Sequence, residues 1–201
     1  MAQQTIDVEK EFAKYAQLDG WLNDVEGRTL FSIAMRGQQS GHIVEIGSWK
    51  GKSSSYLALA AKLRGEKVVC IEHFFGDGKG REELLSTSPG KNSFSEFAYN
   101  LKNNDLYDNT IILAVDSTRA AEIWNKSIKM IFIDGEHSFK AVNNDFRLFE
   151  RFVLVGGFVC FHDVDAEMKN EIATLIKQIA SEGSYNFLGI NGSVGILQKL
   201  K

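Results

Sequence analysis

Four polar residues in the second half of the chain are of types that move protons or bind metal ions. Asp134 follows an apolar run, with His137 shortly after it, and the pair His162-Asp163 follows a second apolar run. If these runs are neighbouring parallel strands, about 4.8 Å apart, the four side chains converge beyond the carboxyl ends of the strands. An imidazole placed there can remove a proton near neutral pH. We therefore predict that His137, His162 and Asp134 are catalytic.

The same cluster also contains the ligand types of a metal site. A divalent ion would lower the pKa of a bound acceptor and position it. Carboxylate oxygens suit magnesium, whereas a histidine shifts the preference toward a transition metal. The sequence therefore predicts a candidate metal site formed by Asp134, His162 and Asp163.

A glycine-bearing turn, VEIGSWKGKSSS, follows an earlier apolar run and could hold an anionic group. Gly47 and Gly51 permit a tight bend, and the amide groups that open the next helix, around Ser53, then face the ligand. A nucleoside triphosphate, a dinucleotide and the carboxylate of S-adenosylmethionine are all candidates. The segment G-x-x-x-G-K-S is one residue shorter than the phosphate-binding loop, and the dinucleotide pattern G-x-G-x-x-G is missing. A structural turn without a ligand is the fourth interpretation.

Two acidic residues at the ends of later runs favour S-adenosylmethionine among these ligands. Glu72 can accept hydrogen bonds from both ribose hydroxyls, as the corresponding acid does in dinucleotide-binding folds. Asp116 follows the next run and is placed to meet the adenine edge. Either acid alone is commonly a helix cap or a solvated loop residue. Their positions at successive strand ends indicate a single ligand.

The pattern of the whole chain predicts the scaffold for these residues. Apolar runs alternate with segments of helical periodicity, which predicts a parallel, doubly wound α/β sheet. We predict one domain over 1–201, with a helical segment in 1–40 and an α/β core in 41–201. Its elements are a helical region at 6–40, strands at 42–46, 67–71, 110–115, 129–133 and 157–161, helices at 53–63, 93–102, 141–152 and 169–181, and an antiparallel pair at 185–190 and 195–199. Serines open the 53–63 helix and can cap it, and residues 75–92 are predicted to form a mobile lid.

Composition excludes several classes of protein. The chain has 201 residues, of which 44% are hydrophobic and 24% charged, and a net charge of −3. A nucleic-acid partner is not expected because there is no basic stretch, and no apolar run is long enough to span a membrane. The polar, acidic amino-terminal segment lacks the features of a signal peptide, which predicts a cytoplasmic location. Cys70 and Cys160 lie in apolar runs and are expected to be free, buried thiols.

Taken in order, the motifs VEIGSWKGKSSSYLA, CIEHF, FIDGEHSF and GGFVCFHD resemble the class I S-adenosylmethionine-dependent methyltransferases. The resemblance is to the small-molecule branch that includes macrocin O-methyltransferase and cephalosporin hydroxylase-like proteins. It implies a Rossmann-like, mostly parallel seven-stranded sheet with an antiparallel C-terminal strand. It also implies a metal site, often magnesium, in some members, with acids at positions matched by Asp134 and Asp163, while His162 replaces a further acid. With the resemblance, the predicted cofactor-binding residues are Glu45, Gly47, Gly51, Ser53, Glu72, Asp116 and Asp134.

We therefore predict a methyltransferase that moves the methyl group of S-adenosylmethionine to a small polar acceptor, with a hydroxyl as the expected target. A P-loop phosphotransferase and a non-catalytic module that binds an adenosyl ligand are the alternatives. The sequence leaves open the acceptor, the use of a divalent metal such as magnesium, and assembly into a homo-oligomer.

Overall fold

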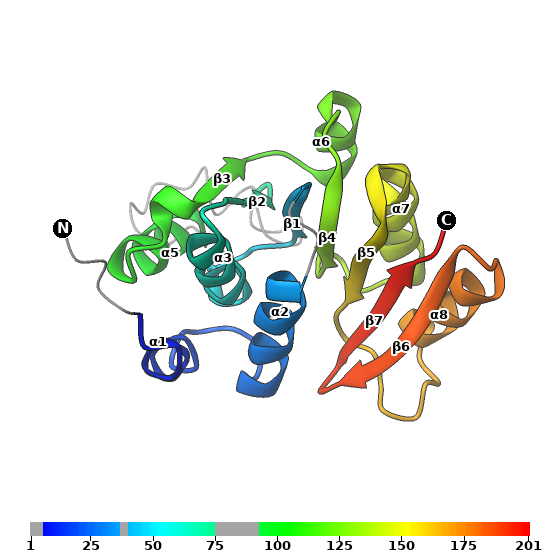
Figure 1. Ribbon diagram of the computed structural model, residues 1–201, viewed down its shortest axis with the longest axis horizontal. Coiled ribbons are helices and arrows are strands. Elements are labelled where there is room, and N and C mark those ends of the chain that lie inside the picture. Colours follow the sequence, from blue (N-terminus) through cyan, green and yellow to red (C-terminus); the bar gives the residue numbers. More distant parts are fainter. Residues whose placement is uncertain (1–5, 37–39, 75–92) are drawn as a thin grey trace, which may run out of the picture.

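A computed structural model describes residues 6–36, 40–74 and 93–201. The strands of this part of the chain form one sheet in the order β3-β2-β1-β4-β5-β7-β6 (Figure 1). The strands are β1 (His42–Ile46), β2 (Val68–Ile71), β3 (Thr110–Leu113), β4 (Ile128–Ile133), β5 (Val153–Phe161), β6 (Tyr185–Asn191) and β7 (Val194–Lys199). The helices are α1 (Val8–Tyr15), α2 (Asp24–Arg36), α3 (Lys52–Arg64), α5 (Ser93–Asn103), α6 (Ser117–Ile123), α7 (Phe139–Phe149) and α8 (Glu171–Ser181), with 3₁₀ turns at Tyr107–Asn109 and Glu150–Phe152.

Helices cover both faces of the sheet (Figure 1). Alternate strand residues point to opposite faces, so each strand contributes to two cores. Ile43 and Phe132 pack with α1, α2, α3 and α5 on one face, whereas Val44 and Ile131 pack with α6, α7 and α8 on the other. Strands buried on both faces are continuously apolar rather than alternating, which explains the short apolar runs of the sequence.

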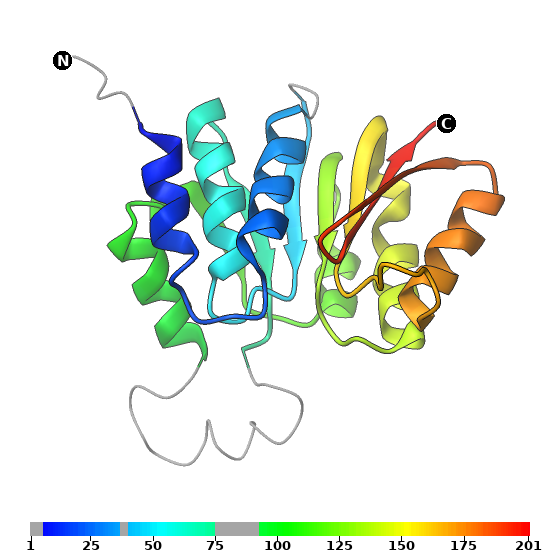
Figure 2. The same cartoon turned by 90° about the horizontal axis from the view of Figure 1, so that it is seen from below.

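The strand order reverses at β1, and this places the site. β1 pairs in parallel with β2 on one side and with β4 on the other. In such sheets ligands bind beyond the carboxyl ends of the strands next to this reversal. Ile46 is level with both Ile71 and Ile133, so β1, β2 and β4 end at one edge, which is the lower edge in Figure 2. β7 runs antiparallel to β5 and β6, as predicted for the end of the chain.

Apart from shifts of element ends, among which β5 begins at Val153 rather than at residue 157, the structure differs from the predicted elements in three places. The helical region at 6–40 is two helices, separated at a segment in which Gly20 has a φ of +153°. The short helix α6 was not predicted, and Asp116 caps it. The expectation that serines cap the helix after β1 is wrong: Gly51 is the cap residue of α3, and no side chain caps the helix. The predicted lid at 75–92 lies outside the described residues.

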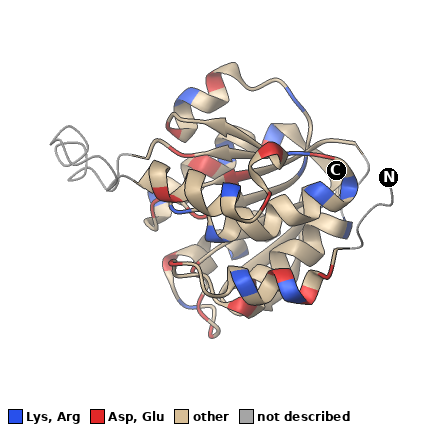
Figure 3. Ribbon diagram, turned by 90° about the vertical axis from the view of Figure 1, so that its left-hand side faces the viewer, with Lys and Arg blue, Asp and Glu red and all other residues tan. Residues whose placement is uncertain are grey.

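The two cysteines are buried and free, as predicted. Cys70 lies on β2 and Cys160 on β5, with β1 and β4 between these strands. Lys and Arg residues are interspersed with Asp and Glu along the ribbon (Figure 3). In the part of the chain that the structure describes, no helix has the length and apolar character needed to cross a membrane.

Candidate active site

The turn between β1 and α3 requires both of its glycines. Gly47 has a φ of +88°, and a Cβ atom there would lie 2.0 Å from the carbonyl oxygen of Asp134. Gly51 has a φ of +86°, and its Cβ would lie 3.0 Å from the ring of Phe97. A side chain at either position would force the backbone to move. The turn therefore lies directly against the end of β4, which brings the predicted cofactor loop beside the predicted reaction centre.

Glu45 supports this turn from beneath. Its side chain has no exposed surface, and its Oε2 atom accepts hydrogen bonds from Ser54 and, at 2.7 Å, from Ser48. Burial raises the pKa of the carboxyl group, and hydrogen bonds from Ser53, Ser54 and Ser48 partly offset this rise. Among the predicted cofactor residues, Glu45 and Ser53 are buried, and the Oε1 atom of Glu45 has no hydrogen-bond partner among the described residues.

The lysine of the apparent G-K-S motif is engaged away from the turn. The Nζ atom of Lys52 donates a hydrogen bond to the carbonyl oxygen of Gly20, 3.3 Å away. A phosphate-binding loop needs this lysine over the phosphates. Its contact with the segment between α1 and α2 therefore argues against the P-loop interpretation.

Glu72 lies at the end of β2 and links the loops that follow β1 and β2. Its Oε2 atom accepts from the backbone N–H of Trp49 at 3.2 Å, and its Oε1 atom accepts from the N–H of Phe74 at 2.8 Å. The carboxylate is thus held at the carboxyl edge, next to the glycine turn. This is the position at which it was predicted to meet a ribose.

Asp116 has a structural role in addition to its predicted contact with adenine. Its side chain caps α6 by accepting from the N–H of Arg119 at 2.8 Å, and the residue is exposed. The next residue, Ser117, donates to the buried carboxylate of Asp145 on α7. Burial raises the pKa of Asp145 to about 6. This contact holds the loop after β3 against α7.

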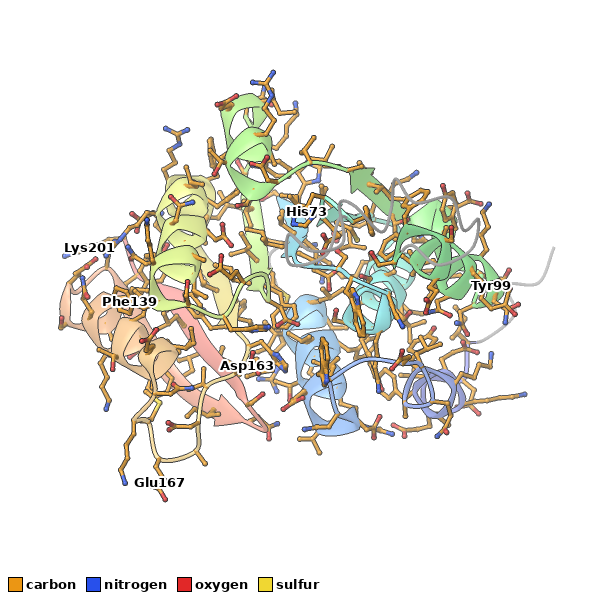
Figure 4. All side chains as sticks on the ribbon, turned by 180° about the vertical axis from the view of Figure 1, so that it is seen from behind. His73, Tyr99, Phe139, Asp163, Glu167 and Lys201 are labelled. Carbon is orange, nitrogen blue, oxygen red and sulfur yellow. The ribbon has the colours of Figure 1, made fainter. Side chains whose placement is uncertain are left out.

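The reaction centre predicted from sequence is assembled at the ends of β4 and β5. The Nδ1 atom of His162 lies 3.0 Å from Asp134 Oδ1 and 3.4 Å from Asp163 Oδ1. His137 Nδ1 lies 2.5 Å from Asp163 Oδ2. Asp163 has a φ of +56°, a conformation that costs energy in a residue other than glycine, and Figure 4 shows where it lies in the loop that follows β5. The four predicted residues therefore form one connected cluster.

The electrostatics of this cluster follow from burial and close pairing. Burial lowers the pKa of His162, but hydrogen bonds with Asp134 and Glu26 outweigh this effect and raise the pKa to about 10. Burial raises the pKa of Asp134. The hydrogen bond between His137 and Asp163 lowers the pKa of Asp163 and raises that of His137. His162 is buried, whereas the side chain of His137 is 61% exposed and accessible to an acceptor.

The structure adds Glu26, which the sequence did not single out. This buried carboxylate on α2 approaches the second ring nitrogen of His162, with Oε2 3.5 Å from Nε2. Burial raises the pKa of Glu26, but hydrogen bonds from His162, Asn23 and Ser193 lower it to about 2. The pattern Asn23-x-x-Glu26 is a capping box that marks the start of α2. That local signal could have located the helix end, but not its contact with a residue 136 positions away.

An aromatic pair flanks the glycine turn. The rings of Trp21 and Trp49 stack with centroids 4.7 Å apart and planes 7° apart. Lys50 Nζ lies 4.6 Å from the ring centroid of Trp49 and is itself paired with Asp19 at 2.6 Å. Trp21 is 82% exposed. The chain before α2 therefore places a flat apolar surface beside the predicted cofactor loop.

The cluster fits a divalent cation. Asp134, His162 and Asp163 can each offer one ligand atom, and these atoms lie within 4.8 Å of one another. The two carboxylates balance the charge of such an ion. Glu26 lies against the Nε2 atom of His162, so that the Nδ1 atom faces the two aspartates. Metal binding displaces protons from its ligands, so an ion would replace the proton that Nδ1 shares with these carboxylates.

Comparison with known proteins identifies the family. A family model described as "Methyltransferase domain" matches residues 44–164, from β1 to just past β5. The chain belongs to this methyltransferase family. The match includes the glycine turn, Glu72, Asp116 and the four residues of the candidate reaction centre. The predictions of a class I methyltransferase fold and of an enzyme that uses S-adenosylmethionine are therefore confirmed.

Solved methyltransferases share this fold at low sequence identity. The O-methyltransferase TomG from Streptomyces achromogenes, solved in complex with SAM, is 15% identical, with a TM-score of 0.65 over 98% of this chain and 92% of that chain. An O-methyltransferase from Bacillus cereus in complex with SAH is 18% identical, with a TM-score of 0.62 over 97% and 89% of the two chains.

The chain is also similar in sequence to the uncharacterized protein R132 of Acanthamoeba polyphaga mimivirus. The two are 28% identical over 144 residues, which span 69% of this chain and 59% of that protein.

Proposed function

We propose that this methyltransferase transfers the methyl group of S-adenosylmethionine to a hydroxyl oxygen of a small acceptor. The observation that carries the proposal is that two groups of residues lie at one edge of the sheet. Glu72 and the glycine turn lie at the ends of β1 and β2, and the cluster of Asp134, His162 and Asp163 lies at the ends of β4 and β5. The contact between Gly47 and the carbonyl of Asp134 joins these groups.

In this proposal the first group holds the cofactor. The amides at the start of α3 bind its carboxylate, because a helix amino terminus favours an anion. Glu72 accepts hydrogen bonds from the ribose hydroxyls, and Asp116 lies on the adenine side. Glu45, with Ser53, Ser48 and Ser54, keeps the turn in shape. Binding of such a cofactor by this fold is supported by the similar TomG and Bacillus cereus structures, which were solved with SAM and SAH.

The second group, together with the adjacent His137, prepares the acceptor oxygen. Methyl transfer requires the oxygen to lie in line with the carbon–sulfur bond and to lose its proton as the new bond forms. His137 is the candidate base because Asp163 engages its Nδ1 atom, which leaves Nε2 on an exposed ring to take the proton. Asp134, His162 and Asp163 would hold a divalent cation, which would lower the pKa of a bound hydroxyl.

The acceptor and the setting of the enzyme are further parts of the proposal. The exposed ring of Trp21 beside the turn favours acceptors that have a planar apolar part. Mixed surface charge favours a small molecule over a nucleic acid. The two free cysteines are compatible with a cytoplasmic location, where thiols stay reduced.

The proposal is tested by incubating the protein with S-adenosylmethionine that carries a trideuterated methyl group and with a panel of phenols, catechols, alcohols, amines and thiols, with and without divalent metals. We expect S-adenosylhomocysteine to accumulate with a hydroxyl compound and the label to appear on oxygen. The His137→Ala variant should bind the cofactor as the wild type does and turn over at least about 100-fold more slowly. Label found only on nitrogen or sulfur, or full activity of the variant, would overturn the assignment.

A further inference from the structure

Glu26 is a buried carboxylate whose contacts exceed the needs of a helix cap. It lies in the first turn of α2 and is 3% exposed. Its Oε2 atom accepts from the backbone N–H of Asn23 at 2.8 Å, which completes the capping box. A capping box needs no more than this contact, and such a glutamate is normally at the surface.

The turn between β6 and β7 closes around the other oxygen of this carboxylate. Oε1 of Glu26 accepts from the N–H and from the Oγ of Ser193, both at 2.8 Å. Gly192 has a φ of +63°, and a Cβ atom there would lie 2.5 Å from the Cγ of Glu26. The carboxylate therefore has one fixed orientation, set by two segments that are far apart in the sequence.

This fixed carboxylate meets His162 on the side of the ring that faces away from the reaction centre. Oε2 lies 3.5 Å from His162 Nε2, and Phe132 packs against the imidazole with ring centroids 5.9 Å apart. The opposite nitrogen, Nδ1, faces Asp134 at 3.0 Å. A rotation of the ring by 180° would replace both nitrogen contacts with carbon atoms.

We propose that Glu26 is a positioning residue for the reaction centre: by accepting a hydrogen bond from His162 Nε2, it fixes the ring so that Nδ1 faces Asp134 and Asp163. The inference rests on the proposed function, in which His162 belongs to the reaction centre. A carboxylate that accepts from one ring nitrogen determines which nitrogen faces a substrate or a metal. The amino end of α2 and the β6–β7 turn thereby control a histidine at the end of β5.

The junction offers a matched pair of variants. Glu26→Gln keeps the size of the side chain but replaces one acceptor oxygen with an amide donor. Asn191→Ala removes the hydrogen bond from Asn191 Nδ2 to Thr29 Oγ1, 2.7 Å long, which also joins α2 to the hairpin. No described contact of Asn191 involves His162. The control therefore weakens the same junction without touching the imidazole.

The first test needs no activity and no variant. In protein labelled with ¹⁵N-histidine, two-bond nitrogen–proton spectra show which ring nitrogen of each imidazole carries a proton, and a His162→Asn sample identifies the signals of His162. We expect a proton on Nε2 of His162 in the wild type, protected from exchange with water. Wild-type spectra that show Nε2 without a proton would overturn the inference even if neither variant folds.

The second test separates positioning from stability. We expect Glu26→Gln to shift or lose the Nε2 proton signal and to lower kcat at least about 10-fold, with the KM for S-adenosylmethionine within about twofold of the wild type. Asn191→Ala should leave the Nε2 signal and kcat unchanged even if its melting temperature falls. Equal losses of kcat in the two variants, or an unchanged Nε2 signal in Glu26→Gln, would refute the role of Glu26. Because the spectra do not depend on turnover, a protein that methylates no hydroxyl compound would refute the proposed function alone.

Discussion

Replacing Asp145 with asparagine should make the protein more stable, and by an amount that depends on pH. Asp145 is 6% exposed on α7 and accepts a hydrogen bond from Ser117. Burial is the main cause that raises the pKa of Asp145 from 3.8 to about 6, and the nearby charges of Glu136 and Asp116 raise it further. A carboxyl group whose pKa is higher in the folded state stabilises the fold when it is protonated and destabilises it when it ionises.

The size of the effect follows from the two pKa values. The favourable contribution of Asp145 is complete below pH 3.8 and is lost as the pH rises through about 6. Because the two pKa values differ by about 2 units, ionisation of Asp145 lowers the free energy of unfolding by about 3 kcal/mol at pH 7.5. At pH 4.5 the group is mostly protonated in the folded state, and the loss is about 1 kcal/mol. Asparagine keeps an oxygen for the Ser117 hydrogen bond and carries no charge. The variant should therefore be more stable than the wild type by about 1 kcal/mol at pH 4.5 and about 3 kcal/mol at pH 7.5.

Urea unfolding of both proteins at several pH values between 4.5 and 7.5 measures this gap, which is the unfolding free energy of the variant minus that of the wild type. The control is Asp108→Asn, at an exposed aspartate, for which we expect a gap below about 0.5 kcal/mol at every pH. A gap for Asp145→Asn that does not widen as the pH rises, or a variant less stable than the wild type at pH 7.5, would show that the buried carboxylate is satisfied by contacts other than Ser117.

Three further predictions concern the site and the core. Glu72→Ala should weaken the binding of S-adenosylhomocysteine by about 1.5–3 kcal/mol in calorimetry, the scale of a charge-assisted hydrogen bond, and unchanged affinity in a folded variant would contradict the ribose contact. Gly47→Ala should abolish cofactor binding and lower the melting temperature, because its Cβ would meet a backbone carbonyl at 2.0 Å, whereas Gly65→Ala, with nothing within 4 Å, should bind normally. Lys129 is fully buried against Glu66; Glu66→Gln should cost about 3–5 kcal/mol in denaturant unfolding, more than Lys129→Met, because only the former leaves a buried charge without its partner.

The sheet could be predicted because its central strands β1, β2 and β4 are buried on both faces. The runs around Val44, Val69 and Ile131 are short and apolar, and they end in glycine or acidic residues that mark the carboxyl edge. The short helix after Asp116 was not predicted because its seven residues show little periodicity, although a helix cap was one of the interpretations of Asp116. The break at Gly20 was missed because helical spacing continues on both sides of it.

The convergence of the candidate catalytic residues could be predicted for the same reason that the sheet could. Asp134 and His162 come directly after strands, so their convergence depends only on strand adjacency. Glu45 shows where this reasoning stops, since its position on a buried strand gives no sign that its Oε2 atom accepts hydrogen bonds from Ser48 and Ser54. Glu26 was out of reach because its contact with His162 depends on how α2 docks against the β6–β7 turn, which no local pattern encodes.

A crystal structure with bound S-adenosylhomocysteine tests the central claim most directly, because it shows the ligand at the edge where the two groups of residues meet. The account predicts ribose hydroxyls on the carboxylate of Glu72, the ligand carboxylate at the amides that follow Gly51, and the sulfur atom facing the cluster of Asp134, His162 and Asp163. S-adenosylhomocysteine bound elsewhere, or with its sulfur directed away from that cluster, would contradict it.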